Sequence, residues 1–180
     1  MSRIGKAPIK LPSNVEVKVE NGLVTVKGPL GQLTQDFDSA NIGIKVEDGQ
    51  IIVSRFNEIN TTRAKHGLYR ALVYAMVVGV TEGYKKTLIV NGVGWKVEQV
   101  GKDIKLSVGL SHPVEYKTVE GITLTVTSPT EIVVSGISKE KVGAEAAKIK
   151  AIRKTEPYHG YGIRLSDEVI ERKEGKTAGK

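Results

Sequence analysis

Hydrophobic and polar residues alternate with a period of two along much of the segment from Val15 to Ser54, which is the pattern of half-buried β-strands. Asn21-Gly22 separates two of these runs. Because both residues tolerate positive φ, this pair predicts a tight hairpin turn, and Asp48-Gly49 predicts another turn. The expected strands are Val15–Val19, Leu23–Val26, Gln32–Phe37, Ile42–Val46 and Ile51–Ser54.

The period changes to that of an α-helix between about Asn60 and Val78, and Asn57 or Asn60 is expected to cap its first turn. Apolar residues share one face of this helix, at Ala64, Leu68, Ala71, Leu72 and Ala75. A polar face carries Arg63, His66 and Arg70. We therefore expect the apolar face to be the packed one and His66 to face solvent or a binding partner.

The second half of the chain repeats this order of short strands followed by one helix. Its helix is expected from about Lys139 to Arg153, with Ser138 as its cap. The buried side of this helix is marked by Val142, Ala146 and Ile149. The expected strands are Lys86–Val90, Trp95–Val100, Ile104–Val108, Val114–Lys117, Ile122–Val126 and Glu131–Ser135.

The two halves align at a shift of about 81 residues, where Gln50–Ser54 matches Glu131–Ser135. This match favours an internal duplication, with coincidence as the alternative. The predicted fold class is therefore α+β, with two tandem similar domains, each made of antiparallel strands packed against one helix. We place the domains at residues 1–81 and 82–180, because Gly79 and Gly83 break the first helix.

The 180-residue chain carries a net charge of +7 and has a pI near 9.5. Excess positive charge favours nucleic acid or an acidic membrane surface as a partner, although a merely basic soluble protein has the same composition. The N-terminal arm carries Arg3 and Lys6 and is kept extended by Pro8 and Pro12, so it is either a solvated tail or an arm lying against phosphate.

The sequence has no cysteine, which excludes disulfides and thiolate chemistry. The longest apolar stretch, Ala71–Val80, is about half the length of a membrane span, and the N-terminus lacks the apolar core of a signal peptide. These features predict a soluble cytoplasmic protein.

No motif for catalysis or metal binding is found. The three histidines lack the spacing of known zinc motifs, and no nucleophile elbow or Walker loop is present. The segment Gly92–Trp95 begins like a dinucleotide fingerprint, but it lacks the third glycine and lies between two predicted strands, so its local pattern favours a tight turn. We therefore expect no enzyme activity, metal, cofactor or small-molecule substrate.

The strongest chemical asymmetry follows the second predicted helix. Four cations stand within seven residues that contain no acid, at Lys148, Lys150, Arg153 and Lys154. Tyrosines and a histidine then alternate with glycines in Tyr158–Arg164. Cations neutralise phosphates, glycine lets the backbone approach them, and tyrosine can stack on a base, so these residues suit RNA. A solvated helix end with a flexible loop remains the alternative, and the nearly apolar-free tail from Glu174 is expected to be flexible.

Several short segments together resemble the large-subunit ribosomal protein six family of bacteria over essentially the whole chain. The segments are Ser2–Ile9, Val26–Gly31, Arg63–Leu72, Gly79–Gly83, Val90–Gly94, Ser111–Val114 and Glu156–Tyr158. The resemblance implies two tandem α+β domains arising by duplication, rRNA binding mainly through the second domain, and a place near the sarcin–ricin loop and stalk base, where translational GTPases dock. It also implies neighbouring ribosomal proteins as partners and no enzymatic activity.

By position, the resemblance implies rRNA contacts at two sets of residues. The main set is Lys148, Lys150, Arg153, Lys154, Tyr158, His159, Gly160, Tyr161, Arg164, Lys173 and Lys176. The secondary set is Gly92, Gly94, Trp95, His112, Arg3 and Lys6. The chain departs from the family at His159 and Tyr161, where the family usually has lysines, and this departure removes two cations at neutral pH.

Two other functions stay open on the residues alone. A tandem-domain module that binds another protein would have the same fold and a basic charge by accident. An enzyme whose site is assembled in space would lack a local motif as this chain does, although no nucleophile–base pair supports it.

Overall fold

A computed structural model of the protein describes residues 3–176 and divides into two compact units. The first unit runs to Gly83 and includes Ile137–Lys139, and the second comprises Tyr84–Gly136 and the chain from Glu140 onward. Each unit combines antiparallel strands with one long helix, so the expected α+β class with two similar units is confirmed.

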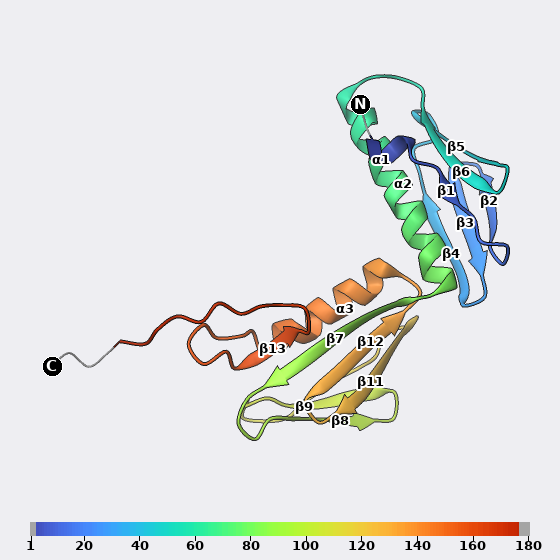
Figure 1. Cartoon of the computed structure of the whole chain (residues 1–180). Coiled ribbons are helices and arrows are strands. Elements are labelled where there is room, and N and C mark those ends of the chain that lie inside the picture. Colours follow the sequence, from blue (N-terminus) through green and yellow to red (C-terminus); the bar gives the residue numbers. More distant parts are fainter. Residues whose placement is uncertain (1–2, 177–180) are drawn as a thin grey trace. The chain divides into compact units, whose positions relative to one another are not determined.

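The first unit contains two three-stranded antiparallel sheets and the long helix α2 (Asn60–Thr81) (Figure 1). One sheet has the order β1-β6-β5 and the other has the order β2-β3-β4. The strands are β1 (Ile9–Lys10), β2 (Glu16–Glu20), β3 (Leu23–Gly28), β4 (Gly31–Asp36), β5 (Ile42–Glu47) and β6 (Gln50–Arg55). Helix α2 contacts β3 and β4 of one sheet and β5 and β6 of the other, so one core joins both sheets.

Both predicted two-residue turns of this unit are present. Asn21 and Gly22 have φ values of 49° and 78°, and they join β2 to β3 with Glu20 paired to Leu23. Asp48, with a φ of 48°, and the glycine after it join β5 to β6 in the same way. Positive φ at both turn positions matches the right-handed twist of the strands and thereby fixes the hairpin register.

The start of the chain differs from the extended arm that we expected. Residues Arg3–Lys6 form the short helix α1, and Ile9 then pairs with Ile51 in β6. Gly5 of α1 lies so close to the His66 ring that an added Cβ would be 2.6 Å from its Nδ1. The arm is therefore packed against the body of its own unit.

The predicted packing face of α2 is wrong. Leu68 is 53% exposed and Ala64 and Ala71 are also exposed, whereas His66 is only 3% exposed. The buried positions of this helix are Thr62, His66, Val73, Met76, Val77, Gly79 and Val80. The predicted cap is wrong as well, because Ile59 occupies the N-cap position and no side chain caps the helix.

His66 is buried because both of its ring nitrogens have partners. Its Nε2 lies 2.9 Å from the carbonyl oxygen of Val53, and its Nδ1 lies 3.2 Å from Nη1 of Arg55. Since an arginine only donates, Nδ1 accepts and Nε2 carries the proton. The histidine is therefore a neutral part of the core of this unit.

The second unit contains a four-stranded sheet of order β11-β12-β7-β13, a three-stranded sheet of order β10-β9-β8, and the helix α3 (Lys139–Ile152). All strand pairs are antiparallel. The strands are β7 (Tyr84–Asn91), β8 (Lys96–Val100), β9 (Asp103–Ser107), β10 (Val114–Tyr116), β11 (Ile122–Ser128), β12 (Glu131–Gly136) and β13 (Gly162–Leu165). The last of these strands was missed by the sequence analysis.

The two units share one topology. In each, a first strand (β1 or β7) pairs with the second strand of a later hairpin (β5–β6 or β11–β12), and a three-stranded meander lies between them in the chain. A helix follows the hairpin in both units, and the hairpin strand before it spans Gln50–Arg55 in one and Glu131–Gly136 in the other. The repeated order supports the duplication and leaves β13 as an addition peculiar to the second unit.

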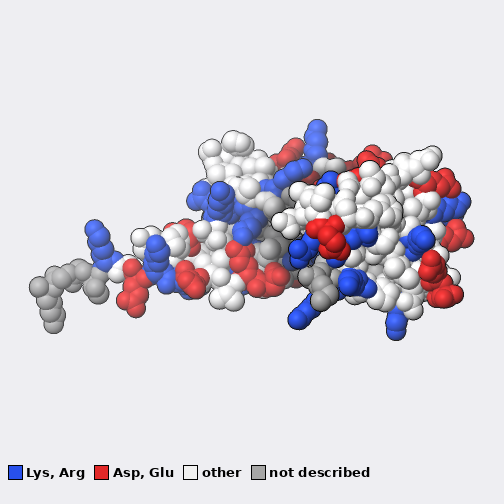
Figure 2. Space-filling model, turned by 90° about the horizontal axis from the view of Figure 1, so that it is seen from above, with Lys and Arg blue, Asp and Glu red and all other residues white. Residues whose placement is uncertain are grey.

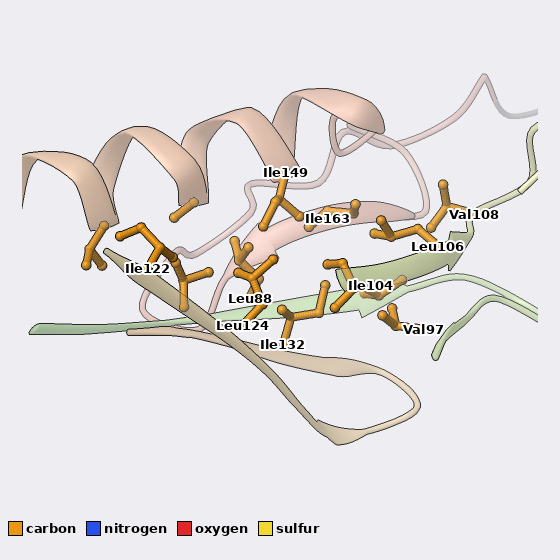
Figure 3. Close-up of a cluster of buried hydrophobic side chains, with 14 residues drawn as sticks. Leu88, Val97, Ile104, Leu106, Val108, Ile122, Leu124, Ile132, Ile149 and Ile163 are labelled. Atoms are coloured by element: carbon orange, nitrogen blue, oxygen red, sulfur yellow. The ribbon is translucent and has the colours of Figure 1, made fainter. Parts of the chain in front are cut away.

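Strand β13 is anchored in the core of the second unit (Figure 3). Ile163 of β13 and Ile149 of α3 are fully buried and both point into the cluster formed with Leu88, Leu124 and Ile132 (Figure 3). Burial of a side chain of this size contributes about 1.5–3 kcal/mol. The segment that joins α3 to β13 is therefore fixed at both of its ends.

Candidate nucleic-acid interface

The segment that follows α3, residues 153–162, comprises the loop to β13 and the first residue of that strand, and it is closed by backbone hydrogen bonds. The amide of Ile163 donates to the carbonyl of Arg153 over 2.8 Å, and the amide of Glu156 donates to the carbonyl of Tyr161 over 2.8 Å. Asn91, at the end of β7, donates from its side-chain nitrogen to the carbonyl of Gly160 over 3.1 Å. These bonds make the loop an ordered extension of the sheet, which we call the C-terminal loop.

Two glycines of the C-terminal loop have a positive φ, at 75° for Gly160 and 146° for Gly162. A Cβ on Gly162 would lie 2.4 Å from the Cα of Thr155, which is a backbone atom that no side-chain movement can clear. Glycine is therefore required at residue 162, where the two sides of the loop meet.

Aromatic side chains gather where the C-terminal loop meets the β7–β8 turn. The rings of His159 and Tyr161 are stacked, with centroids 5.4 Å apart and an interplanar angle of 13°. The Trp95 ring lies 6.5 Å from that of Tyr161, and the Arg153 guanidinium lies over the indole at 5.6 Å from its centroid. The fold thus brings together residues from two distant segments. We call this group the aromatic cluster (Trp95, Arg153, His159 and Tyr161).

Gly92 and Gly94 lie in the β7–β8 turn and shape it around Trp95. An added Cβ on Gly92 would be 2.2 Å from the indole, and one on Gly109, after β9, would be 2.8 Å from its Nε1. Gly94 has a φ of 74°, which the turn requires. The indole is therefore held between two glycine backbones, so its ring position is set by the fold.

The four cations of the acid-free segment are in different environments. Lys148 donates to Glu145 over 2.6 Å, and Lys150 donates to both carboxylate oxygens of Glu168 over 2.6 and 2.7 Å. Arg153 and Lys154 are exposed and form no ion pair with any residue in the range 3–176. Acids outside this segment therefore pair the first two cations, one from the preceding turn of α3 and one from the chain after β13. The last two cations are the stronger candidates for phosphate.

Glu168 ties the chain after β13 to α3. Besides its bonds to Lys150, it accepts the amide of Leu165 over 3.1 Å, and its backbone carbonyl accepts Nη1 of Arg164 over 3.0 Å. The hydrogen bond from Lys150 is the main reason that the pKa of Glu168 lies below its usual value. Arg164 is half-buried, and its Nη1 donates to the carbonyls of Leu165 and Glu168.

Glu145 is a buried acid that the sequence analysis did not single out. It is only 4% exposed, and it accepts hydrogen bonds from the Tyr116 hydroxyl at 2.5 Å and from Lys148. Burial acts to raise the pKa of Glu145, but these two hydrogen bonds outweigh it and leave the pKa below its usual value. Burial and the same carboxylate raise the pKa of Tyr116. The pair fastens β10 to α3.

Replacing Tyr116 with phenylalanine is expected to lower the free energy of unfolding of the second unit by about 1.5–3 kcal/mol, because a buried carboxylate loses a hydrogen bond. Urea unfolding followed by the fluorescence of Trp95, the one tryptophan of the chain, measures this loss. Tyr158→Phe is the matched control, since Tyr158 is 52% exposed and its hydroxyl bonds to no described residue. Equal stability of the two variants would contradict the assignment.

The remaining predicted contacts are not all in one place. Tyr158 and His159 are exposed on the C-terminal loop, and His112 is exposed between β9 and β10, with Nδ1 3.4 Å from the Ser111 hydroxyl. Lys173 and Lys176 are exposed in a segment without helix or strand, where the amide of Lys173 donates to the carbonyl of Pro157 over 2.8 Å. Residues 177–180 of the predicted flexible tail lie outside the described residues.

Arg3 and Lys6 are exposed on α1 of the first unit, so they belong to a different unit from the C-terminal loop. Figure 2 shows lysine and arginine side chains interspersed with acidic ones over the face in view. This face therefore offers an anion local groups of cations and not one continuous basic surface.

In residues 3–176 no three histidine or acidic side chains are grouped as they would be around a metal ion. Within the same range, no helix combines the length and apolarity that a membrane crossing requires.

The chain matches the family model described as Ribosomal protein L6 in two segments, residues 11–83 and 91–165. It is 51% identical over 178 residues to large ribosomal subunit protein uL6 of Clostridium perfringens, covering 98% of this chain and 99% of that protein. Proteins of the same name from Ligilactobacillus salivarius and Exiguobacterium sibiricum are 52% and 50% identical over 177 residues, with 98% of this chain and 99% of theirs covered. The first matched segment lies in the first unit and the second lies, apart from Ile137–Lys139, in the second unit. The chain belongs to the ribosomal protein L6 family.

Proposed function

We propose that this protein is a non-catalytic structural constituent of the large ribosomal subunit and binds large-subunit rRNA mainly through its second domain, residues 82–180. The observation that carries this proposal is the rigid C-terminal loop, which presents Arg153 and Lys154 beside exposed aromatic rings. The relatives are named as proteins of the large ribosomal subunit, which supports the same partner. Ribosomal proteins of this family are structural components and not enzymes.

The mechanism is positional. Arg153 and Lys154 neutralise phosphates and release their counterions, which supplies affinity without reading a sequence. The loop is fixed by its hydrogen bonds to β7 and by burial of Ile163, so it fits RNA of one shape and not another. A rigid protein that binds RNA segments in this way holds them in their folded arrangement.

From the family resemblance we propose that this contact lies near the sarcin–ricin loop and the base of the stalk, where translational GTPases dock. Other large-subunit proteins are the proposed neighbours in the cytoplasmic ribosome. The secondary contacts proposed at Gly92, Trp95 and His112 belong to the same unit as the loop. Arg3 and Lys6 are proposed as a separate contact of the first unit.

Sedimentation tests the proposal against a module that binds only protein. The native protein is expected to travel with the large subunit in a high-salt gradient, and the purified protein is expected to bind large-subunit rRNA directly. A protein-binding module would instead stay with a protein partner after nuclease treatment. Absence from the large subunit at every salt concentration would contradict the proposal.

Restoring lysine at both residues 159 and 161, in the variant His159→Lys with Tyr161→Lys, is expected to steepen the salt dependence of rRNA binding. Each new phosphate contact adds roughly 0.7–0.9 to the slope of log K against log salt, so two contacts add roughly 1.4–1.8. Kd values measured across a salt series give this slope. An unchanged slope would show that these two residues do not face phosphate.

A further inference from the structure

We propose that the aromatic cluster and the cavity beside it form a binding site for one unpaired nucleobase of the RNA, with Arg153 and Lys154 holding the adjoining phosphates. This proposal rests on the proposed function and deepens it, because it names the part of the RNA that the loop recognises. Its basis is the arrangement of rings and charges around the stacked side chains of His159 and Tyr161.

The rings form a ready stacking surface. His159 and Tyr161 are nearly parallel and stacked, and the Trp95 ring lies tilted by 54° to that of Tyr161, with the two centroids 6.5 Å apart. Tyr161 is 38% exposed, so its ring is accessible from solvent although it is part of a packed group. Bases stack on such rings because every base has a π-face, and single-stranded RNA is bound in this way by other folds.

A cavity of about 390 Å³ opens beside these rings, lined by Trp95, Ile152, Arg153, Lys154, Glu156 and Tyr161. This volume lies at the lower end of the range of small-molecule sites, which suits one base with its sugar. The indole that forms one wall is held between Gly92 and Gly109, and the Arg153 guanidinium covers part of it. The wall is therefore in place before a ligand arrives, and a base would lose little free energy in ordering the site.

Glu156 favours a base over a phosphate inside this cavity. Its Oε1 accepts the amide of His159 at 2.5 Å and lies 2.9 Å from Nδ1 of the same residue. The hydrogen bond from the backbone amide of His159 is the main reason that the pKa of Glu156 lies below its usual value, so the carboxylate is charged at neutral pH. A carboxylate repels a phosphate but accepts a hydrogen bond from an amino or imino group on the edge of a base.

The cations stand where the backbone of such a nucleotide would run. Arg153 and Lys154 border the cavity and are exposed, whereas Lys150 is paired with Glu168. A base in the cavity would thus bring its flanking phosphates to two unpaired cations. Phosphate binding alone would use these cations but would leave the three rings and the carboxylate without a function.

A bulged nucleotide in a short RNA duplex is the probe for this site. Three duplexes are compared with the full-length protein: one with a bulged adenosine, one with an abasic ribose at the bulge, and one fully paired. The adenosine bulge is expected to bind roughly 5- to 100-fold more tightly than the abasic bulge. It is also expected to quench the fluorescence of Trp95, which reports on this site alone because the chain has no other tryptophan.

Tyr161→Lys removes a ring of the cluster and adds a cation. This variant is expected to lose the preference for the adenosine bulge while retaining binding to RNA in general. Tyr74→Lys is the matched control, because Tyr74 is an exposed tyrosine on α2 of the first unit, and it should keep the full preference. If Tyr161→Lys fails to fold, the three duplexes compared on the unaltered protein still decide the question.

The outcomes separate this inference from the proposed function. Equal affinity for the adenosine and abasic bulges, with unchanged Trp95 emission, would overturn the base site while binding to large-subunit rRNA stands. Loss of discrimination in Tyr74→Lys as well would also overturn it, because the preference would then not come from the cluster. Absence of binding to large-subunit rRNA itself would instead overturn the proposed function.

Discussion

Replacing Arg153 and Lys154 together with alanine is expected to weaken binding to large-subunit rRNA by roughly 15- to 30-fold at 0.15 M salt. Each phosphate contact changes log K by roughly 0.7–0.9 per unit of log salt, and two lost contacts produce this loss at that concentration. The slope should fall by roughly 1.4–1.8 in the same series. Filter binding or fluorescence anisotropy at several salt concentrations gives both values.

The matched control replaces Lys102 and Lys117 of the same unit with alanine, which removes the same charge from exposed positions outside the C-terminal loop. The slope of log K against log salt should be nearly unchanged in this control variant, because charges outside the interface act only through the screened long-range field. Both variants are expected to stay folded, since their side chains are exposed, and the Arg153 variant should lose only the cation–π contact with Trp95, about 0.5–1 kcal/mol. Equal losses in the two variants would mean that net charge, and not Arg153 and Lys154, determines affinity.

Replacing Gly162 with alanine is expected to lower the free energy of unfolding of the second unit by roughly 2–6 kcal/mol. The residue has a φ of 146°, which costs a residue with a side chain about 1–3 kcal/mol, and its Cβ would lie 2.4 Å from the Thr155 backbone, for which overpacking adds about 1–3 kcal/mol. The midpoint of urea unfolding, followed through Trp95, measures the loss. Binding to rRNA should fall with it, because the C-terminal loop is closed at this residue.

Gly101→Ala separates the strain of a positive φ from the clash of an added Cβ with the backbone. Gly101 has a φ of 62°, but nothing lies within 4 Å of its added Cβ, so this variant should lose only about 1–2 kcal/mol. A Gly162 variant as stable as the Gly101 variant would show that the two sides of the loop do not meet as described.

The strands and hairpins could be predicted from the sequence because their signals are local. The Asn21-Gly22 turn sets positive φ in two consecutive residues, and the alternating valines around it select one face. Repetition of the Gln50–Ser54 segment at Glu131–Ser135 was sufficient to indicate duplication, and the two units do share one topology. Strand β13 gave no comparable signal, since only four residues form it and two glycines lie just before or within it.

The packing face of α2 could not be predicted from its period. Its C-terminal half is apolar on every side, so the period there selects no face. In its N-terminal half the buried residues are the polar Thr62 and His66, and His66 is stable in the core because Val53 and Arg55 bond to its ring. Those partners come from β6, and a helical pattern contains no information about them.

The candidate interface was predicted as a segment but not as a geometry. The cations and the C-terminal loop were identified from their composition. Pairing of Lys150 depends on Glu168, which is distant in the sequence, and burial of Glu145 depends on the packing of the core. The contact of Trp95 with Tyr161 likewise joins two segments that only the β7–β13 pairing brings together. Asn91, which holds the loop, has no sequence signal apart from its place at a strand end.

A density map of the large subunit assembled with this protein is the most direct test of whether the C-terminal loop binds rRNA. We expect nucleotides in contact with Arg153, Lys154 and Tyr161, with phosphate oxygens near the two cations. A map in which residues 153–162 face only solvent or another protein would contradict it.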